Sequence, residues 1–276
     1  MILNIKGGIL DLSSPKIMGV LNVTPDSFYD GGVFSNEKKI LAQVEKMILD
    51  GADIIDIGGF SSKPGAKTIS LKEEEKRVIP IIKLINKTFN KIIISVDTFR
   101  SEIAEKSLNE GASIINDISG GDLDKNIYQI SYKYKAPYIM MHMNGVPSNM
   151  QNNPKYENIN HDIIKDFTSK IDSAEKKGVC DIIIDPGFGF GKTIQHNYQI
   201  LNNLKLYTVL KKPILVGISR KSMIYKLLKT DPSKALNGTT SLNTIALING
   251  ANILRVHDVK EAKEVIKLYS FLKENV

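Results

Sequence analysis

The chain has 276 residues, of which 42% are hydrophobic and 24% charged, a balance that is typical of globular proteins and excludes a disordered one. Its formal charge of +7 would suit an anionic partner, but the lysines are dispersed and no basic stripe with interleaved aromatic residues occurs, which argues against nucleic acid. We interpret the lysines as solvated surface charge, with a phosphorylated small substrate as the second interpretation. No apolar run reaches the length of a membrane span and no leader pattern opens the chain, so we expect a cytoplasmic protein outside the membrane.

Short β-branched runs alternate with amphipathic segments, the pattern of parallel strands joined by helices. Eight such runs follow one another, at residues 17–21, 54–57, 92–96, 113–115, 138–141, 182–184, 214–218 and 253–256. They are almost continuously apolar, so both faces of each strand are expected to be buried. Eight strand and helix pairs predict a (β/α)8 TIM barrel of the α/β class, with residues 1–276 forming a single domain. A doubly wound open sheet would give similar local signals.

Helix boundaries are marked by capping residues. Ser70 with Glu73 predicts a capping box, and Asp231 before Pro232 predicts an N-cap followed by proline in the first turn. Four glycines follow helical patterns and are expected to take the left-handed conformation that ends a helix: Gly51, Gly111, Gly178 and Gly250.

Polar residues follow all eight predicted strands. In a parallel barrel, catalytic groups lie at the carboxyl ends of the strands and in the loops after them. The residues at these ends include Asn22, Asp56, Asp97, Asn116, His142, Asp185, Ser219 and Arg255. A single Asp there is ordinary, because Asp often begins a turn or caps a helix, and we interpret Asp117 and Asp258 in this way. The whole set predicts one pocket in which a ligand compensates the desolvation of the polar groups.

A glycine-rich segment follows the sixth strand. It ends in Gly191-Lys192-Thr193, as a phosphate-binding Walker loop does, but Pro186 stands where that motif needs its first glycine. A nucleotide triphosphatase is therefore disfavoured. We expect the glycines to let the backbone bend over a flat ligand, held between Phe188 or Phe190 and the barrel rim.

The histidines and the lone cysteine do not have the spacing of a zinc site. We expect His161 and His196 on the surface, and Cys180, which precedes an apolar run, to be buried. Arg255 and His257 are two residues apart on a strand and therefore point to the same side. They predict a cationic clamp for a diphosphate, with a salt bridge to a nearby carboxylate as the alternative.

The ordered motifs resemble those of dihydropteroate synthase over nearly the whole chain. They read Asn-Val-Thr-Pro-Asp-Ser-Phe at 22–28, Asp-Pro-Gly-Phe-Gly-Phe-Gly-Lys at 185–192, Gly-Ile-Ser-Arg-Lys-Ser at 217–222 and Leu-Arg-Val-His-Asp at 254–258. The resemblance implies a (β/α)8 barrel that condenses 6-hydroxymethyl-7,8-dihydropterin diphosphate with p-aminobenzoate and releases pyrophosphate. It also implies assistance by Mg²⁺, a homodimer, and a target of sulfonamides.

Carried over residue by residue, the resemblance implies three groups of contacts. The pterin would be bound by Asp97, Asn116, Asp185 and Lys221. The diphosphate would be bound by Asn22, Ser62, Arg255 and His257, with Asn22 also a ligand of Mg²⁺. The p-aminobenzoate would lie near Phe28, Ser62, Pro64, Phe190, Ser219 and Lys221. The catalytic residues would be Asp97, Lys221, Arg255 and His257.

The mechanism that we expect is a dissociative substitution, in which pyrophosphate leaves before the arylamine attacks the cationic pterin methylene. Arg255, a protonated His257 and Mg²⁺ would stabilise the leaving group, while Asp97 would offset the cation. No side-chain nucleophile is required.

One loop departs from the pattern that the resemblance implies. Members commonly carry Glu, Thr and Arg where this chain has Phe60, Ser62 and Lys63. Ser62 keeps the hydroxyl and Lys63 the charge, but Phe60 removes a carboxylate.

Two alternatives share the pterin-binding residues. Methyltetrahydrofolate methyltransferases resemble the chain at Asp97, Asn116 and Asp185, but they would not need the Arg255 and His257 clamp. The other alternative is a non-catalytic pterin-binding paralogue, against which the complete catalytic set argues.

Overall fold

The computed structural model of the chain describes residues 1–23, 33–60, 69–145, 150 and 154–275. A short antiparallel hairpin, β1 (Ile2–Ile5) and β2 (Gly8–Asp11), comes first. The described residues then form eight parallel strands: β3 (Lys16–Asn22), β4 (Ile54–Gly58), β5 (Ile93–Asp97), β6 (Ile114–Asp117), β7 (Tyr138–Met141), β8 (Ile182–Asp185), β9 (Leu215–Val216) and β10 (Ile253–Val256). Their order is β8-β7-β6-β5-β4-β3-β10-β9, and a parallel bridge from Ile184 to Ile214 joins the two ends of the sheet. The predicted (β/α)8 barrel is therefore confirmed.

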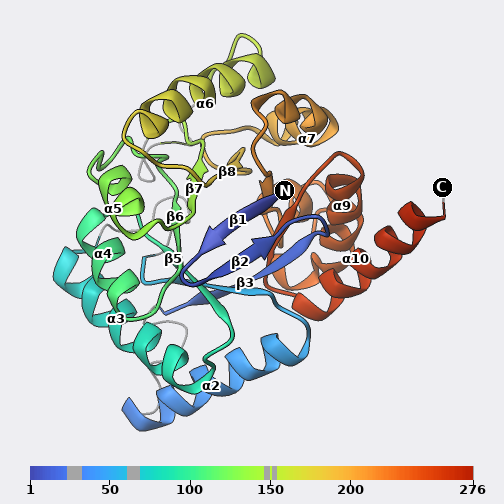
Figure 1. Cartoon of the computed structure of the whole chain (residues 1–276). Helices are drawn as coiled ribbons and strands as arrows, with labels where there is room; N and C mark the ends of the chain where they lie inside the picture. The colour runs from blue at the N-terminus through green and yellow to red at the C-terminus, as the bar shows by residue number, and fades with distance from the viewer. Residues whose placement is uncertain (24–32, 61–68, 146–149, 151–153, 276) are drawn as a thin grey trace.

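Helices surround the barrel (Figure 1). The α-helices are α2 (Val33–Leu49), α3 (Leu71–Thr88), α4 (Ser101–Asn109), α5 (Ile127–Tyr134), α6 (Ile159–Glu175), α7 (Ile194–Asn202), α8 (Ser222–Tyr225), α9 (Leu236–Ile248) and α10 (Val259–Glu274). The short 3-10 helices are η1 (Leu204–Leu210) and η2 (Pro232–Lys234). Within the described ranges, none of the helices combines the length and the apolar character that crossing a membrane requires.

Most of the predicted boundary signals are confirmed. The Ser70 hydroxyl accepts a hydrogen bond from the Glu73 backbone N–H at 3.2 Å, although the Glu73 carboxylate pairs with Arg77 rather than closing a capping box. Asp231 caps a helix as expected, but that helix is the 3-10 helix η2. The four helix-ending glycines have φ values of +103°, +122°, +86° and +100°, at Gly51, Gly111, Gly178 and Gly250.

An apolar layer fills the amino-terminal end of the barrel. The hairpin, which the sequence analysis did not anticipate, lies across this end (Figure 1). Its Leu3 and Leu10, together with Leu12, pack against interior residues from the strands. These are Met18, Ile54, Ile114, Ile139, Ile183, Leu215 and Ile253. The hairpin thus closes the end of the barrel opposite to the polar strand ends.

Cys180 is exposed, so the prediction that it is buried is wrong. The strand that follows begins only at Ile182. Cys180 therefore falls in the connection from α6, which runs over the surface of the protein.

The strand register brings the predicted polar residues to one level. Asp97 is paired with Gly58 on one side and with Asn116 on the other. Gly58 in turn is paired with Asn22. Since all these strands are parallel, the side chains lie at the same carboxyl-terminal rim.

Candidate active site

Arg255 bridges two carboxylates inside the rim. Its Nε donates to Asp56 Oδ2 at 2.7 Å, and its Nη2 donates to Asp97 Oδ2 at 2.7 Å. Asn116 Nδ2 donates to the same Asp56 oxygen at 3.0 Å. Residues from four strands, β4, β5, β6 and β10, are therefore joined in one network. The salt-bridge alternative for Arg255 is what the structure contains.

Burial makes this network electrostatically costly. It raises the pKa of Asp97 to about 7, with the Arg255 charge opposing the rise and Asp56 adding to it. The guanidinium is thus the group that compensates for placing the two carboxyl groups so close together. Buried charged groups with a shifted pKa are thus clustered at the rim, as is common at functional sites.

Asp185 and Lys221 form the other half of the predicted pterin contacts. Asp185 ends β8, is buried, and accepts a hydrogen bond from the Gly187 backbone N–H at 2.8 Å. Burial raises its pKa, and the Lys221 charge opposes that rise. The Lys221 ammonium donates to the Phe188 carbonyl at 2.5 Å and lies 4.8 Å from the centroid of the Phe190 ring. Burial lowers the pKa of Lys221 to about 8.

Ser219 and His257 form a pair on neighbouring strand ends. Ser219 Oγ lies 3.1 Å from His257 Nδ1 and accepts from the His257 backbone N–H at 3.2 Å. Desolvation of the ring, and then the Arg255 charge, lower the pKa of His257, although the residue is exposed at the rim. The prediction of a protonated His257 concerns the state with a bound diphosphate, so it stays a prediction.

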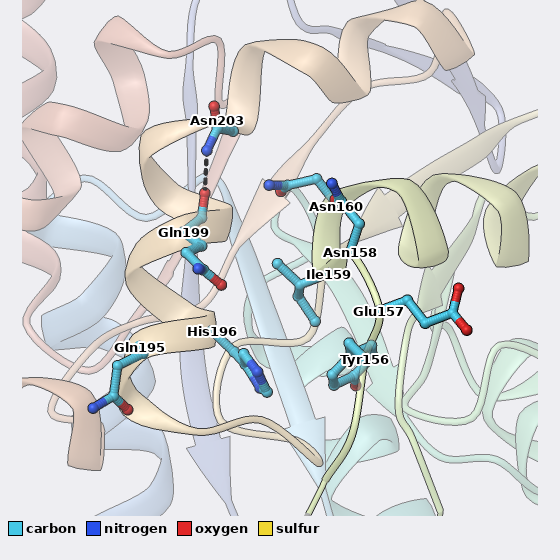
Figure 2. A pocket seen from close by; sticks show the side chains of 9 residues that line it. All are labelled: Tyr156, Glu157, Asn158, Ile159, Asn160, Gln195, His196, Gln199 and Asn203. Carbon is cyan, nitrogen blue, oxygen red and sulfur yellow. Dashed lines mark hydrogen bonds between the residues drawn. The ribbon is translucent and has the colours of Figure 1, made fainter.

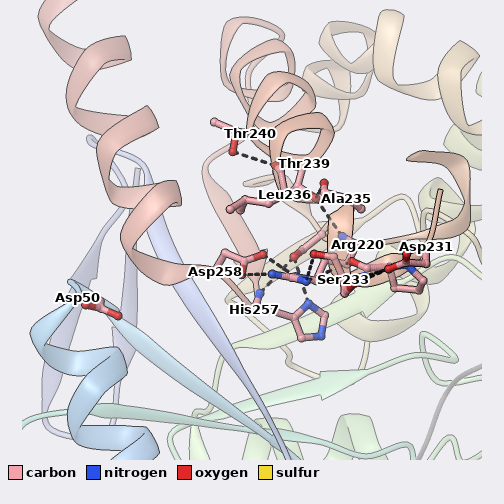
Figure 3. A network of polar contacts seen from close by, with 12 residues as sticks. Asp50, Arg220, Asp231, Ser233, Ala235, Leu236, Thr239, Thr240, His257 and Asp258 are labelled. Carbon is pink, nitrogen blue, oxygen red and sulfur yellow. Dashed lines mark hydrogen bonds and ion pairs between the residues drawn. The ribbon is translucent and has the colours of Figure 1, made fainter. Parts of the chain in front are cut away.

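Arg220, between Ser219 and Lys221, is part of the scaffold (Figure 3). Its backbone is left-handed, with φ of +55°. Its guanidinium donates to both oxygens of Asp258, at 2.8 and 2.7 Å, and to the carbonyls of Pro232 and Ser233. Asp258 stands at the N-cap position of α10 but makes no side-chain capping hydrogen bond, so its structural role is the ion pair with Arg220.

Asp117 is likewise structural. Its carboxylate accepts from the backbone N–H groups of Ser119 and Gly121 and from the Tyr138 hydroxyl. It begins a turn, as the sequence predicted.

An apolar cluster lies beside the charged network. It contains Ile118, Met141, Met143, Met150 and Phe190, with Phe60 and Phe99 packed against it. The rings of Phe60 and Phe99 meet edge to face, with centroids 6.1 Å apart. Phe60 thus adds apolar surface here. Phe188 does not: it is fully buried in the core between strands and helices, so the prediction that it could cover a ligand is wrong.

Comparison with known proteins identifies the family. A family model described as pterin binding enzyme matches residues 18–257. The dihydropteroate synthase of Escherichia coli strain K12 is 42% identical over 265 residues, which cover 95% of this chain and 93% of that protein. The chain belongs to the dihydropteroate synthase family.

Solved structures of the dihydropteroate synthase family are similar over the whole barrel. The enzyme of Yersinia pestis with a sulfonamide drug complex has a TM-score of 0.93 and 40% identity, covering 99% of this chain and 100% of that one. The enzyme of Xanthomonas albilineans with 4-aminobenzoic acid has a TM-score of 0.92 and 33% identity, covering 99% and 98%. This chain is accordingly a transferase, and the methyltransferase and non-catalytic alternatives are not favoured.

Three predicted contacts, Phe28, Ser62 and Pro64, lie outside the described residues, as does Lys63. Of the remaining predicted residues, Asn22 is exposed at the end of β3, and the others converge on the rim as described above.

Asp56 was predicted to lie at the rim, but it was not assigned to any substrate. It is fully buried and accepts from both Asn116 and Arg255. The signal was present in the sequence, because Asp56 interrupts a run of isoleucines that must otherwise be buried.

A separate cavity of about 370 Å³ lies between the start of α6 and α7 (Figure 2). Its lining includes Tyr156, Asn160, His196 and Gln199, and none of the predicted site residues lines it. His196 also closes a capping box with Thr193, so it is half-buried rather than a free surface residue. This cavity is therefore distinct from the candidate active site.

Proposed function

We propose that this chain condenses 6-hydroxymethyl-7,8-dihydropterin diphosphate with p-aminobenzoate, giving 7,8-dihydropteroate and pyrophosphate for folate biosynthesis. The observation that carries the proposal is the convergence of Asp97, Asn116, Asp185 and Lys221 on the rim where Arg255 and His257 also lie. Binding and catalytic groups are thus brought together from five strands or the loops that follow them.

In this proposal the pterin ring lies among Asp97, Asn116 and Asp185. Their carboxylate and amide oxygens accept hydrogen bonds from the donor edge of a 2-amino-4-oxo ring. A bound pterin would supply donors to carboxyl groups that are otherwise costly to bury, which supports this placement. Lys221, beside Asp185, would donate to an acceptor of the substrate.

The diphosphate is assigned to Asn22, Ser62, Arg255 and His257. The contacts of Arg255 with Asp56 and Asp97 use two of its five N–H donors. The remaining donors can serve phosphate oxygens. An anion beside His257 favours the charged imidazolium, so we expect the ring to take up a proton when the diphosphate binds.

The reaction proceeds by dissociative substitution in this proposal. The bond between the pterin methylene carbon and the diphosphate oxygen breaks, and its electron pair leaves with pyrophosphate. The amine nitrogen of p-aminobenzoate then forms the new bond to the methylene carbon and releases a proton. Asp97 offsets the positive charge of the pterin methylene, while Arg255 and His257 stabilise the leaving group. No covalent enzyme intermediate is formed.

Mg²⁺ is proposed as the assisting metal, with Asn22 as its protein ligand. Among the described residues, no three His, Cys, Asp or Glu side chains are grouped so as to hold a metal ion. A single amide oxygen at a strand end fits a cation held mainly by phosphate oxygens and water. When bound, Mg²⁺ would neutralise charge on the diphosphate.

The p-aminobenzoate is assigned to the outer part of the site, near Phe28, Ser62 and Pro64 and above Phe190, Ser219 and Lys221. The apolar cluster around Phe190 supports this placement, because a flat aromatic ring can pack on it. We also propose that sulfonamides compete with p-aminobenzoate for this part of the site.

The cytoplasmic location of the protein stays a prediction.

We propose that a second copy of the chain covers α9 and α10, which pack side by side. Large apolar side chains are exposed on both helices, at Ile245, Ile248, Leu268, Phe271 and Leu272. Exposed large apolar side chains on two adjoining helices suit an interface between protein chains. Light scattering of the wild type and of Leu268→Asp tests the proposal: a dimer that becomes monomeric is expected, and a wild-type monomer would contradict it.

A pyrophosphate-release assay with pterin diphosphate, p-aminobenzoate and Mg²⁺ tests the proposed function. Release should require both organic substrates, and omission of p-aminobenzoate is the matched control. Pterin binding without release would favour the non-catalytic alternative. Methyl transfer from methyltetrahydrofolate to cobalamin would favour the methyltransferase.

A further inference from the structure

Lys192 is a buried lysine that the proposed mechanism does not use. Its side chain is 3% exposed, and its ammonium group lies within hydrogen-bonding distance of four acceptors. These are the carbonyls of Gly187 and Phe190, both at 2.9 Å, the carbonyl of His142 at 3.2 Å, and His142 Nδ1 at 3.0 Å. One ammonium group is thus within hydrogen-bonding distance of both the loop after β7 and the loop after β8.

The contacts fix the states of both partners. An ammonium group can only donate, so Nδ1 of His142 accepts and the imidazole carries its proton on Nε2. Burial, followed by the Lys192 charge, lowers the pKa of His142 well below its ordinary value, in agreement with a neutral ring. Burial also lowers the pKa of Lys192 to about 7, and Asp185 opposes that shift. Three carbonyls and a ring nitrogen around one nitrogen atom favour the ammonium form, which has three donors rather than two.

The two loops are in direct contact where Lys192 joins them. A Cβ atom at Gly187 would lie 2.0 Å from the His142 carbonyl oxygen, and one at Gly191 would lie 2.5 Å from the Asn144 carbonyl oxygen. Both glycines have positive φ, at +71° and +61°. The loops therefore approach more closely than side chains would allow, and Lys192 supplies the donors for the carbonyls that this approach buries.

The same loop carries residues of the proposed site. Lys221 donates to the carbonyl of Phe188, which lies between the two loop carbonyls that Lys192 holds, those of Gly187 and Phe190. The Phe190 ring lies over Lys221. The position of that ring relative to Lys221 is thus set by two lysines acting on consecutive parts of one loop.

We propose that Lys192, with His142 as its acceptor, is a positioning residue that holds Phe190 in place for the arylamine substrate. The inference rests on the proposed function for the identity of that substrate. Asp97, Asn116 and Asp185 belong to strands, and of these three only Asp185 has a side-chain hydrogen bond to the loop, from the Gly187 backbone N–H. Loss of Lys192 should therefore impair the use of p-aminobenzoate more than that of the pterin diphosphate.

The test compares Lys192→Met with Lys170→Met. Lys170 is also a buried lysine, but it lies on α6 and pairs with Asp122 and Asp166. Both variants should have a lower Tm. Only Lys192→Met should raise KM for p-aminobenzoate, by about tenfold, with kcat and the KM for pterin diphosphate changed by less than about threefold.

Substitutions of His142 provide a second test of the positioning role, which remains available if Lys192→Met does not fold. His142→Asn retains an acceptor close to the position of Nδ1 and should keep a nearly normal KM for p-aminobenzoate. His142→Leu removes the acceptor and should raise that KM. Equal KM values in these two variants, or equal changes of all constants in Lys192→Met, would overturn the proposal.

Hydrogen exchange of the backbone N–H groups of residues 187–191 gives a readout that does not depend on catalysis. Faster exchange is expected in Lys192→Met and His142→Leu, but not in Lys170→Met or His142→Asn. Unchanged exchange in Lys192→Met would refute the positioning role even if the enzyme is active. A wild type that releases no pyrophosphate would instead refute the proposed function, and the exchange data would still decide the role of Lys192.

Discussion

The two ends of the barrel interior differ in chemistry, although the same strands build both. On four strands an isoleucine of the amino-terminal layer is followed two residues later by a polar residue of the rim. The pairs are Ile54 and Asp56, Ile114 and Asn116, Ile183 and Asp185, and Ile253 and Arg255. Residues two apart on a strand share a face. On each of these strands the apolar layer and the polar rim are therefore only two residues apart.

This difference separates stability from function. The apolar layer, closed by the β1–β2 hairpin, gains free energy from burial and contains no group that could do chemistry. The rim holds buried charges whose desolvation is unfavourable, and a stable fold does not require them. Substitutions at one end should therefore affect mainly the free energy of unfolding, and those at the other mainly turnover.

The largest effect is expected for Arg255→Ala. It should lower kcat/KM by about 100-fold to 1,000-fold, the loss seen when one preorganised donor to a developing negative charge is removed. Pyrophosphate release measures this loss. Arg255→Lys, which keeps the charge but not the planar fork, is the control and should recover part of the rate. Nearly normal turnover in Arg255→Ala would show that Arg255 is not needed for catalysis. It would also contradict the assignment of function to this end of the barrel.

The hairpin side chain Leu10 tests the opposite end. Leu10→Ala should lower the free energy of unfolding by about 2–5 kcal/mol, because it opens a cavity in the apolar layer. Urea unfolding measures this change, and Leu10→Met should cost less than about 1.5 kcal/mol. At a temperature where both proteins are folded, kcat/KM should be unchanged. A rate loss comparable to that of Arg255→Ala would contradict the separation.

The strand positions were predicted from sequence where apolar runs are sharply bounded. The ends of β7 and β10 coincide with the predictions, whereas β9 is limited to Leu215–Val216 because its run continues into the loop that carries Ser219. The hairpin was missed because its strands have only four residues each, too few for a clear period. Its signal is the short Lys6-Gly7 turn, where Gly7 has a φ of +74°.

The sequence placed the site residues on one rim but did not determine their partners. Strand order and parallel pairing are enough to bring Asp97, Asn116 and Asp185 to that rim. The direction of a long side chain is not determined by them, so the sequence left a salt bridge of Arg255 as an alternative without naming Asp56 and Asp97 as its carboxylates. The prediction that residues 1–276 form a single domain remains a prediction.

Asp97→Asn should alter the pH dependence of stability. The folded pKa of Asp97, about 7, lies above its ordinary value of 3.8, so between these values the folded state binds the proton more tightly. Wild-type stability attributable to Asp97 is therefore complete below pH 3.8 and is lost as pH rises toward 7. Asparagine does not titrate. The stability of the variant relative to wild type should thus rise with pH, by about 1.4 kcal/mol at most for each pH unit in this window. Urea unfolding at several pH values measures the slope, and a flat difference would contradict it.

The smallest effect is expected for Cys180, which lies at the amino-terminal side of β8, near Gly8 of the hairpin. Because its side chain is exposed, a maleimide should react with it fully in the folded protein, whereas a buried thiol would resist. Cys180→Ser should change the free energy of unfolding by no more than about 0.5 kcal/mol and provides the unlabelled control. Pyrophosphate release should be the same before and after labelling, because the reaction takes place at the opposite end of the barrel. Maleimide treatment that inhibits the wild type but not Cys180→Ser would mean that a change at the amino-terminal end of the barrel alters activity at the other end. That result would contradict the separation of stability and function.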